Sequence, residues 1–402
     1  MEISEKKRTM TFLLFLLSCF VSSFLATALA TALPEIIRDL QVDAGTGQWM
    51  TSGYGIAMGI SILFTSFFLN HFSVKKVFLF SMLSFILGAG LSGFAHSFFV
   101  MMLGRVLQAW GNGLINTMAQ VVILSMYPKE KRGFIMGWYG VSIGVAPVVA
   151  PVLTGCVVDT FGWQWVFYGV AIVMGIAFLG ACFLVESDLK IGQDSLFLDI
   201  HVVKEKAFLH GVLGSCLVFF VMMGASVLMP LFVQETLGCK ATISGFVALP
   251  GAILLAVVSP IAGKIYDRVG IRKIFIVGSL LLFLGNIFMS FVSMGTPLWL
   301  VAAYHGIRSI AFGLLIMPLV TWGNSDLGKR QVSSGTSMIN AARTFAGSAG
   351  AALFVWMACT FGESQMKGGG LRGQKIAFAG MTVVAFLLFV QALFCTKKSN
   401  DL

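Results

Sequence analysis

Twelve apolar stretches, each long enough to cross a lipid bilayer, fill almost the whole of this chain. A hydrocarbon core about 30 Å thick is crossed by roughly 20 apolar residues in a helix. Because 57% of the 402 residues are hydrophobic and only 11% are charged, the composition argues against a soluble globular domain. The sequence therefore predicts an all-α polytopic membrane protein with 12 transmembrane helices. We expect the spans to begin near Thr11, Trp49, Val77, Phe98, Gly133, Gln164, Phe208, Ala241, Ile274, Leu298, Ser334 and Ala377.

The positions of Lys and Arg predict how the chain is oriented. With a cytosolic N-terminus, the inside segments hold 19 of the 27 basic residues and the outside loops hold 5. The positive-inside rule then places both termini in the cytosol and the protein in the plasma or cytoplasmic membrane. Anionic headgroups beside these residues account for the net charge of +10 without a nucleic-acid partner. Lys6 to Arg8 followed by an apolar run also resembles a cleavable signal peptide, but the run continues to Leu33, which is long enough to span.

A polar connector divides the chain into two halves that echo each other. We expect a six-helix bundle over residues 1–186, a cytosolic connector over 187–206 and a second six-helix bundle over 207–402. Arg105 in the fourth span corresponds to Arg308 in the tenth, and the loop after the second span corresponds to the loop after the eighth. Many secondary transporters are built from such a repeat, with the substrate site between the halves near the membrane midplane.

Three motifs carry a resemblance to a known family. The loop from Gly263 to Lys273 resembles the cytosolic loop motif of the major facilitator superfamily, and the segment from Gly104 to Gly111 resembles that superfamily's motif in its fourth span. The fifth span resembles the exporters' glycine-proline motif, through Gly140, Gly144, Pro147, Pro151 and Gly155. Ala32-Leu33-Pro34 and the segment from Arg343 to Gly350 resemble the 14-span drug:proton antiporter branch, less two central helices. The resemblance implies two pseudo-symmetric six-helix bundles that work by alternating access around a central cavity.

The loop motif has a functional and an ordinary interpretation. The resemblance implies a latch that holds the cytosolic side shut, formed by Gly263, Asp267, Arg268, Gly270, Arg272 and Lys273. Asp267 could reach the N-terminus of a neighbouring helix or an arginine. The alternative is a basic loop that only obeys the positive-inside rule. Asn70 stands at the corresponding place of the first half, so we expect any latch there to be weaker.

The glycine-proline motif of the fifth span also has two interpretations. Small residues let helices approach closely, while Pro147 and Pro151 each remove a backbone hydrogen bond and are expected to bend the helix. The resemblance implies a packing seam that favours export. Ordinary membrane-helix packing is the alternative, and Ala146, Ala150 and Thr154 replace glycines that the pattern expects.

Charged and polar residues inside the spans are the candidates for substrate binding or coupling. They are Arg105, Gln108, His305, Arg308 and Arg343. An arginine within a span is costly and usually faces a cavity or a partner. Arg105 and Arg308 could bind an anionic group or assist proton transfer, or they could be structural residues tied to backbone carbonyls. Arg343 lies near the cytosolic end of its span and could extend to the membrane surface.

An acidic residue is missing where the resemblance implies one. In the antiporter branch a carboxylate lies in the first span, and the corresponding residue here is Leu25, with Ala30 at a companion polar position. No Asp or Glu lies well inside any predicted span, whereas three arginines do. We therefore expect a neutral or anionic substrate and not a cationic drug. Protons are the coupling ion that the resemblance implies, and transport driven by membrane potential or without coupling stays open.

The sequence as a whole predicts secondary active export of small organic molecules. An uptake permease for organic anions is one alternative, and a degenerate relative that senses a ligand or scaffolds a complex is another, motivated by Leu25 and Asn70. An enzyme is not expected, because the sequence has no nucleotide-binding loop, no His-Glu-x-x-His and no intramembrane pair of acids. No cofactor or metal site is expected. The expected partners are the lipid bilayer and a small organic substrate, with the protein acting as a monomer.

Overall fold

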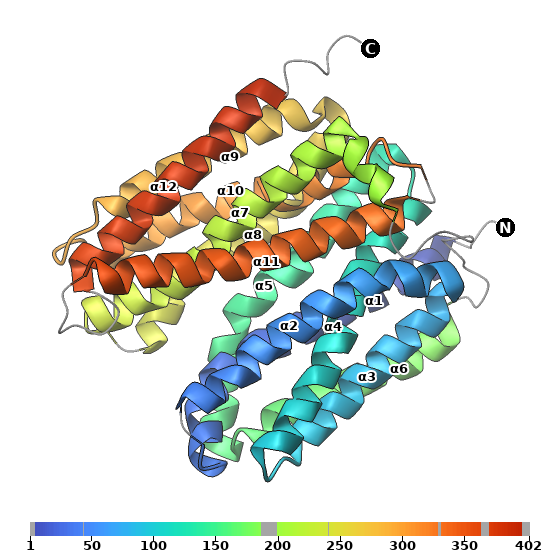
Figure 1. The fold of residues 1–402 in the computed structure, drawn as a ribbon, viewed down its shortest axis with the longest axis horizontal. Helices are drawn as coiled ribbons and strands as arrows, with labels where there is room; N and C mark the ends of the chain where they lie inside the picture. Colours follow the sequence, from blue (N-terminus) through green and yellow to red (C-terminus); the bar gives the residue numbers. More distant parts are fainter. Residues whose placement is uncertain are drawn as a thin grey trace. The chain divides into compact units, whose positions relative to one another are not determined.

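A computed structural model describes residues 5–42, 44–185, 199–239, 241–328, 331–362 and 370–395 of the chain. Long α-helices account for nearly all of these residues, and no β-strand occurs among them. The prediction of an all-α chain is confirmed (Figure 1). The helices are α1 (Glu5–Asp39), α2 (Ala44–His71), α3 (Val74–Gly93), α4 (Phe98–Met126), α5 (Lys129–Phe161), α6 (Gln164–Leu184), α7 (Lys206–Leu231), α8 (Ala241–Val269), α9 (Ile271–Ser290), α10 (Leu298–Gly323), α11 (Val332–Thr360) and α12 (Gly370–Cys395). A 3₁₀ turn (Ile200–Lys204) precedes α7, and a π-helical turn (Phe232–Thr236) follows it.

Ten of the helices in the described part of the chain are long and apolar enough to cross a membrane, judged by length and composition. The other two long helices, α5 and α11, have 33 and 29 residues and correspond to the fifth and eleventh expected spans. Helix α5 begins with four charged residues before a long uncharged apolar stretch, and α11 is rich in serine, glycine and alanine and contains Arg343.

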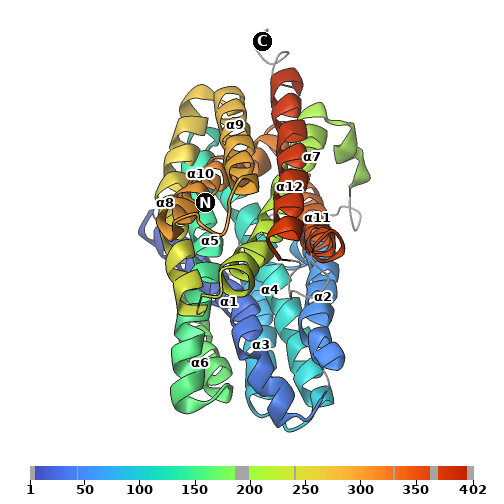
Figure 2. The same ribbon diagram turned by 90° about the vertical axis from the view of Figure 1, so that its left-hand side faces the viewer.

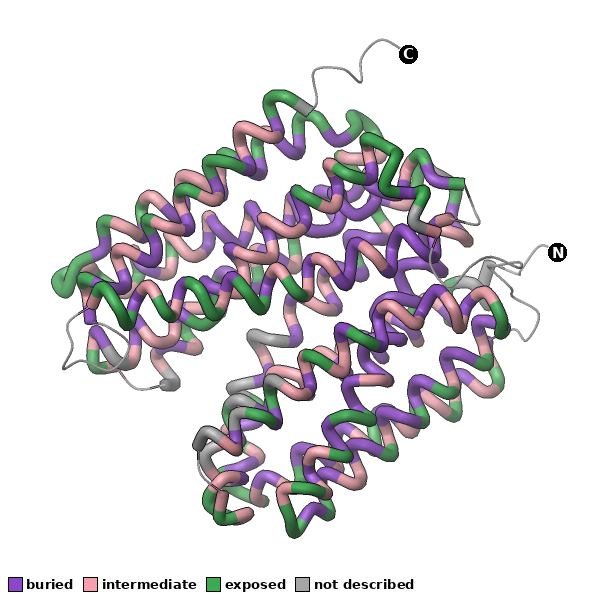
Figure 3. Tube along the Cα trace, viewed as in Figure 1, coloured by how far each residue is buried: buried purple, intermediate pink, exposed green. Residues whose placement is uncertain are grey.

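Helix α6 shows how the outer surface is suited to lipid. Large apolar side chains at helical spacing are exposed by 59 to 86%, and they are Ile172, Ile176, Leu179 and Phe183. The opposite side of the helix is buried, with Met174 and Ala181 at 0% exposure. The same separation of buried and exposed sides recurs along other helices (Figure 3). A contiguous apolar surface of this kind is rare on a soluble protein and is expected where a helix faces the acyl chains of lipids.

One compact unit contains Met1–Tyr127, Val145–Val202 and Leu327–Ala341. Within it α4 packs against α2 and α3, and α6 packs against α1 and α3 (Figure 2). Glycines bring α3 and α4 into backbone contact: a Cβ on Gly88 would lie 2.6 Å from the Gly104 carbonyl oxygen, and a Cβ on Gly111 would lie 2.5 Å from the Ser81 carbonyl oxygen. Such close approach is how membrane helices associate where apolar side chains gain little over lipid.

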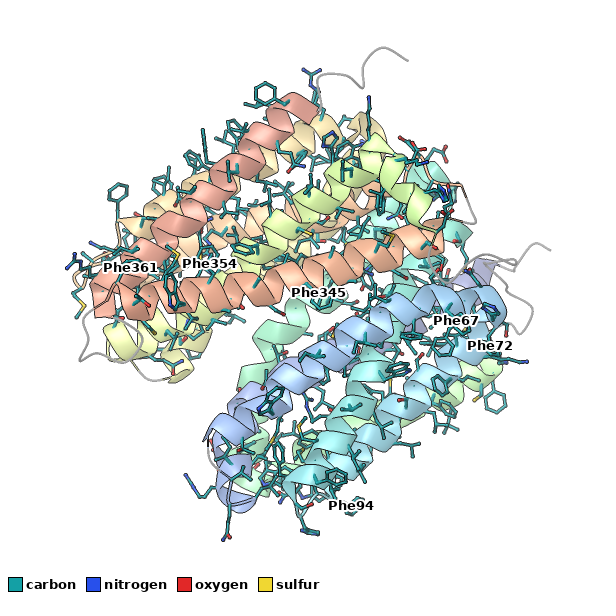
Figure 4. All side chains as sticks on the ribbon, viewed as in Figure 1. Phe67, Phe72, Phe94, Phe345, Phe354 and Phe361 are labelled. Atoms are coloured by element: carbon teal, nitrogen blue, oxygen red, sulfur yellow. The ribbon has the colours of Figure 1, made fainter. Side chains whose placement is uncertain are left out.

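A second compact unit contains Pro128–Gly144, Val203–Asp326 and Ala342–Leu402. In this unit α10 packs against α7, α8 and α9, and α12 packs against α9. Phe354 on α11 is buried, with its ring centroid 5.3 Å from that of Phe220 on α7. Phe345 on the same helix is 54% exposed, and Phe361 lies just past the helix end (Figure 4). Phe345 and Phe354 are nine residues apart, so the exposed and the buried phenylalanine lie on opposite sides of α11.

The two compact units do not follow the order of the chain. The boundary between the units falls within α5, after Gly144, and within α11, after Ala341. The two parts of each of these continuous helices are therefore assigned to different units. The division of the sequence into two six-helix domains joined by a connector over 187–206 stays a prediction.

The contact between α3 and α4 gives a paired test. We expect Gly88→Val to lower the midpoint of thermal unfolding in detergent, because the new side chain meets the backbone of Gly104 and Gln108. Overpacking of this kind costs about 1–3 kcal/mol or more. Gly90 lies half a turn away and has no atom within 4 Å of an added Cβ, so Gly90→Val is the matched control and should leave the midpoint near that of wild type. Equal midpoints for the two variants would contradict the packing described here.

Candidate functional site

The loop between α8 and α9 grips the first turns of α5 through Asp267. The two carboxylate oxygens accept hydrogen bonds from the backbone N–H groups of Gly133 and Phe134, at 2.8 and 2.9 Å. A negative charge near the start of a helix is stabilised by the helix dipole and by its free N–H groups. Of the two partners expected for Asp267, a helix N-terminus or an arginine, the structure gives it the helix N-terminus.

Two glycines allow this grip. A Cβ on Gly263 would lie 1.9 Å from the carbonyl oxygen of Gly133, so the backbones of α8 and α5 are in direct contact there. Gly270 has a φ of +72° in the turn between α8 and α9, a conformation that favours glycine. Among the described residues, Arg268, Arg272 and Lys273 make no hydrogen bond or ion pair, and all three are exposed.

The glycines of the fifth span behave unequally. A Cβ on Gly140 would lie 2.5 Å from Ser259 Oγ, and a Cβ on Gly144 would lie 2.1 Å from a methyl group of Leu255, so α5 packs closely on α8 at both places. A Cβ on Gly155 would meet no atom within 4 Å. Pro147 and Pro151 lie inside α5, but their side chains are outside the described part of the structure. Close packing is therefore observed at the first two glycines of the motif, and a packing seam that favours export stays a prediction.

Arg105 on α4 is fully buried and tied to its own unit. Its Nε donates to the carbonyl oxygen of Met50 at 3.2 Å, and its Nη1 donates to Gln108 Oε1 at 2.8 Å. The guanidinium carbon lies 3.9 Å from the ring centroid of Tyr54, within the range of a cation–π interaction. Gln108 in turn donates to the carbonyl of Gly88 and to Ser92 Oγ, at 2.9 and 2.7 Å. Arg105 and Gln108 thus lie in direct contact, and the arginine's main partners are neutral.

A polar stripe continues along α4 from this arginine. Asn112 Nδ2 donates to the Tyr54 hydroxyl at 2.6 Å, and Asn116 Nδ2 donates both to Asn112 and to Ser22 Oγ on α1. These residues were not among the candidates predicted from the sequence. The signal was present, because Arg105, Gln108, Asn112 and Asn116 follow one another at intervals of three or four residues on a helix that is otherwise largely apolar.

Arg308 on α10 has the same depth of burial and different surroundings. It is 0% exposed, and its Nε, Nη1 and Nη2 atoms have no hydrogen-bond partner among the described residues. The ring of Phe378 on α12 lies 5.7 Å from its guanidinium carbon. His305, one turn earlier on α10, packs against Gly251 of α8, and its Nδ1 also lacks a partner in the described structure.

Arg343 on α11 is buried and does not reach an exposed edge. Its side chain is 6% exposed, and the guanidinium carbon lies 4.6 Å from the ring centroid of Phe219 on α7. The sequence allowed Arg343 to extend toward the membrane surface; the structure instead places it against an aromatic ring. Among the described residues of their unit, Arg308 and Arg343 lie against different aromatic rings, those of Phe378 and Phe219.

A small apolar pocket of about 210 Å³ lies elsewhere, between α1, α5 and α6. Phe24, Thr154 and Trp165 are among the residues that line it. None of the candidate residues predicted from the sequence lines this pocket, and none of its lining residues is charged.

The start of α11 is held by an acid from the connector, in an arrangement that we call the Asp199 clasp. Gln331 Nε2 donates to Asp199 Oδ2 at 3.0 Å, the Asp199 N–H donates to Ser334 Oγ at 3.1 Å, and Ser334 Oγ lies 3.0 Å from Ser66 Oγ on α2. The hydrogen bond from Gln331 is the largest influence that holds the pKa of Asp199 below its ordinary value of 3.8. The sequence reasoning missed this clasp, because nothing near Asp199 resembles a motif.

The grip of Asp267 on α5 can be tested by hydrogen exchange. We expect Asp267→Asn to increase the rate of amide exchange at Gly133 and Phe134, since hydrogen bonds to a charged acceptor are worth about 1.5–3 kcal/mol each. Mass spectrometry of the peptide that covers the start of α5 would measure the rate. Asp326→Asn is the control, because it removes an exposed acid of the same unit that accepts a hydrogen bond from Ser325 and makes none to α5 among the described residues. Unchanged exchange in Asp267→Asn would contradict the grip.

The Asp199 clasp has a separate test. We expect Asp199→Ala to speed tryptic cleavage after the exposed Lys204, because Gln331 loses its carboxylate partner. Asp326→Ala, which removes an exposed acid that takes no part in the clasp, should leave the rate near that of wild type. A carboxyl group whose pKa is lowered by folding stabilises the folded state fully at pH values above its ordinary pKa. This stabilisation is lost as the pH falls through the lowered pKa. The wild-type clasp should therefore persist between about pH 5 and pH 7; a loss of protection within that range would contradict it.

The comparisons with known proteins agree with this geometry. A profile described as the Major Facilitator Superfamily matches residues 15–351 of the chain. The MFS-type transporter YcnB of Bacillus subtilis (strain 168) is 29% identical over 446 aligned positions, which cover 96% of this chain and 94% of YcnB. The lincomycin resistance protein LmrB of the same organism is 27% identical, with 88% of this chain and 86% of LmrB covered. The multidrug export protein EmrB of Escherichia coli (strain K12) is 25% identical, with 81% of this chain and 75% of EmrB covered.

A solved structure shares the fold. The proton:xylose symporter XylE superposes with a TM-score of 0.75 at 14% sequence identity, covering 96% of this chain and 95% of XylE. At that identity the likeness concerns the fold alone. The family profile, however, spans most of the chain, and the helices, the loop between α8 and α9 and the buried arginine of α4 lie where the motifs require. The chain belongs to the Major Facilitator Superfamily and is a multi-pass membrane transporter of small molecules, not an enzyme.

Proposed function

We propose that this transporter exports small organic molecules that are neutral or anionic. The names of its relatives support export, since LmrB is described as a lincomycin resistance protein and EmrB as a multidrug export protein. Chains of this family that share 25 to 27% identity can differ in substrate, so the chemical class has to come from this chain's own residues.

The charge of the membrane-spanning segments carries the proposal. Arg105, Arg308 and Arg343 are buried by 94% or more. In the ten candidate spans the one acid is Asp267, which lies near the end of α8 and is already hydrogen-bonded to α5. Leu25, at the position where the antiporter branch has an acid, is 0% exposed. An interior with buried cations and no free carboxylate repels a lipophilic cation and attracts an anion.

The loop between α8 and α9 fits a gate on the cytosolic side. The distribution of basic residues supports a topology with both termini in the cytosol, which places the start of α5 and the end of α8 on that side. Because α5 belongs to the first predicted six-helix domain and α8 to the second, the bonds from Gly133 and Phe134 to Asp267 would have to break when the cytosolic side opens. Alternating access needs such a contact, made in one state and absent in the other.

Protons are our proposed coupling ion, and the monomer is our proposed functional unit. His305 is the buried group on α10 whose ordinary pKa lies nearest neutrality. An uptake permease for organic anions is the second candidate, because a positively charged interior selects for anions without setting the direction of transport.

The test is transport in proteoliposomes with an imposed pH gradient. We expect wild type to move carboxyfluorescein, a fluorescent anion, at a rate well above that of empty liposomes, and to move ethidium no faster than empty liposomes do. Fluorescence of the trapped dye measures both rates. Movement of ethidium by wild type would contradict the proposed substrate class. The sign of the gradient that drives the anion distinguishes export from uptake.

A matched pair of variants tests the reason for this selectivity. Leu25→Asp supplies the acid that the first span lacks, and Leu25→Asn supplies a polar side chain of similar size without the charge. We expect ethidium transport to appear in Leu25→Asp and not in Leu25→Asn, with both variants checked for a monodisperse elution profile. Ethidium transport by both variants would mean that polarity, and not charge, sets the selectivity.

A further inference from the structure

The two arginines that correspond in the halves of the chain differ in how their charge is accommodated. Arg105 donates to a backbone carbonyl and to Gln108, and it lies over the ring of Tyr54. Arg308 is equally buried, yet none of its three nitrogen atoms has a hydrogen-bond partner in the described structure. The repeat has thus preserved the guanidinium and lost the groups that satisfy it.

The loss can be followed residue by residue. When the halves are aligned through Arg105 and Arg308, Ala311 stands at the place of Gln108. When they are aligned through the close-packed Gly88 and Gly285, Met289 stands at the place of Ser92. The alignment of the loop motifs puts Gly251 where the first half has Tyr54. Three groups that surround Arg105 therefore have counterparts without a hydrogen-bonding side chain or an aromatic ring.

A guanidinium in these surroundings needs an anion. Burial of an unpaired charge in an apolar interior is strongly unfavourable even after the surroundings relax, and arginine cannot lose its proton to avoid this. The ring centroid of Phe378 lies 5.7 Å from the guanidinium carbon of Arg308, which is near the outer limit of a useful cation–π interaction. No acid from α9, α10 or α12 is available, since these helices contain no Asp or Glu.

We propose that Arg308 forms an anion-binding site for a small carboxylate or a halide between α9, α10 and α12. Gly285 of α9 makes room for the stem of Arg308, because a Cβ there would lie 2.7 Å from Arg308 Cγ. The guanidinium then presents two parallel N–H donors, which match the two oxygens of a carboxylate. His305 Nδ1, also without a partner one turn away, offers a further polar group. Arg105, whose Nε and Nη1 donate within the protein and whose guanidinium lies over Tyr54, has a structural role in the first half.

This inference deepens the proposed function and rests on it for the origin of the natural anion. A carboxylate would come from the transported substrate, whereas a halide would come from the medium. The two sources share one chemistry, a single negative charge that accepts hydrogen bonds from a guanidinium, and they are separated by the choice of probe.

The site can be tested by ligand-dependent thermal unfolding of the purified full-length protein, with no transport involved. A ligand that binds the folded state alone raises the unfolding midpoint in proportion to the logarithm of its concentration above Kd. We expect sodium benzoate to raise the midpoint of wild type by several degrees and benzamide, its neutral isostere, to leave it unchanged. Sodium chloride in place of benzoate tests the halide: a rise with chloride and none with benzoate assigns the site to the medium's anion, and the reverse assigns it to a carboxylate.

Variants locate the effect. Arg308→Met should abolish the anion-dependent rise, Arg308→Lys should retain part of it, and Arg372→Met, which removes an exposed arginine of α12, should retain all of it. An equal rise in wild type and Arg308→Met, or no rise with either anion in wild type, would overturn the proposal. Because binding is measured without turnover, an anion-dependent rise without carboxyfluorescein transport would leave the site intact and count against the transport proposal alone.

Discussion

A polar group in the hydrocarbon core of a bilayer has no water to pair with, so a buried donor or acceptor of this transporter is stabilised by a partner in the protein or by a bound ligand. This constraint explains why the polar side chains gather on a few helix faces. Helix α4 concentrates them in one stripe. Arg105 and Gln108 donate to backbone carbonyls of α2 and α3, and Asn112 donates to the hydroxyl of Tyr54 on α2. Close backbone packing at Gly88 and Gly111 keeps those carbonyls within reach. The hydrogen bonds and the glycine contacts therefore depend on each other.

The helices were predictable from the sequence because each one is encoded by a continuous run of apolar residues long enough to cross a bilayer. The spans expected near Phe98, Gln164, Ala241 and Leu298 begin at those residues in the structure. The grip of Asp267 was also foreseeable in kind, since an acid between two glycines at a helix end can reach a helix N-terminus. The stripe at Asn112 and Asn116 was readable from its spacing and was overlooked. The Asp199 clasp was not predictable, because it joins residues that lie more than 130 positions apart and share no motif.

The halves of the chain keep the same architecture and differ in their electrostatics. The start of α5 receives a carboxylate from the loop between α8 and α9. At the start of α11 the corresponding loop offers Asn70, and Asp199 of the connector supplies the negative charge next to Gln331 and Ser334. The helix dipole at α11 is thus met by an acid from another part of the chain. The arginines differ in the same manner, since Nε and Nη1 of Arg105 have hydrogen-bond partners, whereas no nitrogen of the Arg308 guanidinium has one among the described residues.

The contact between Gly263 and Gly133 has a consequence for how the gene can vary. Each glycine lies against the backbone of the other, and backbone atoms cannot be exchanged for smaller ones. Every amino-acid substitution at a glycine codon adds at least a Cβ, so a change at either position cannot be compensated by shrinking the other. Single substitutions at the crossing of α5 and α8 are therefore expected to be rejected. Gly155, on the same helix α5, has room for a side chain and can be substituted.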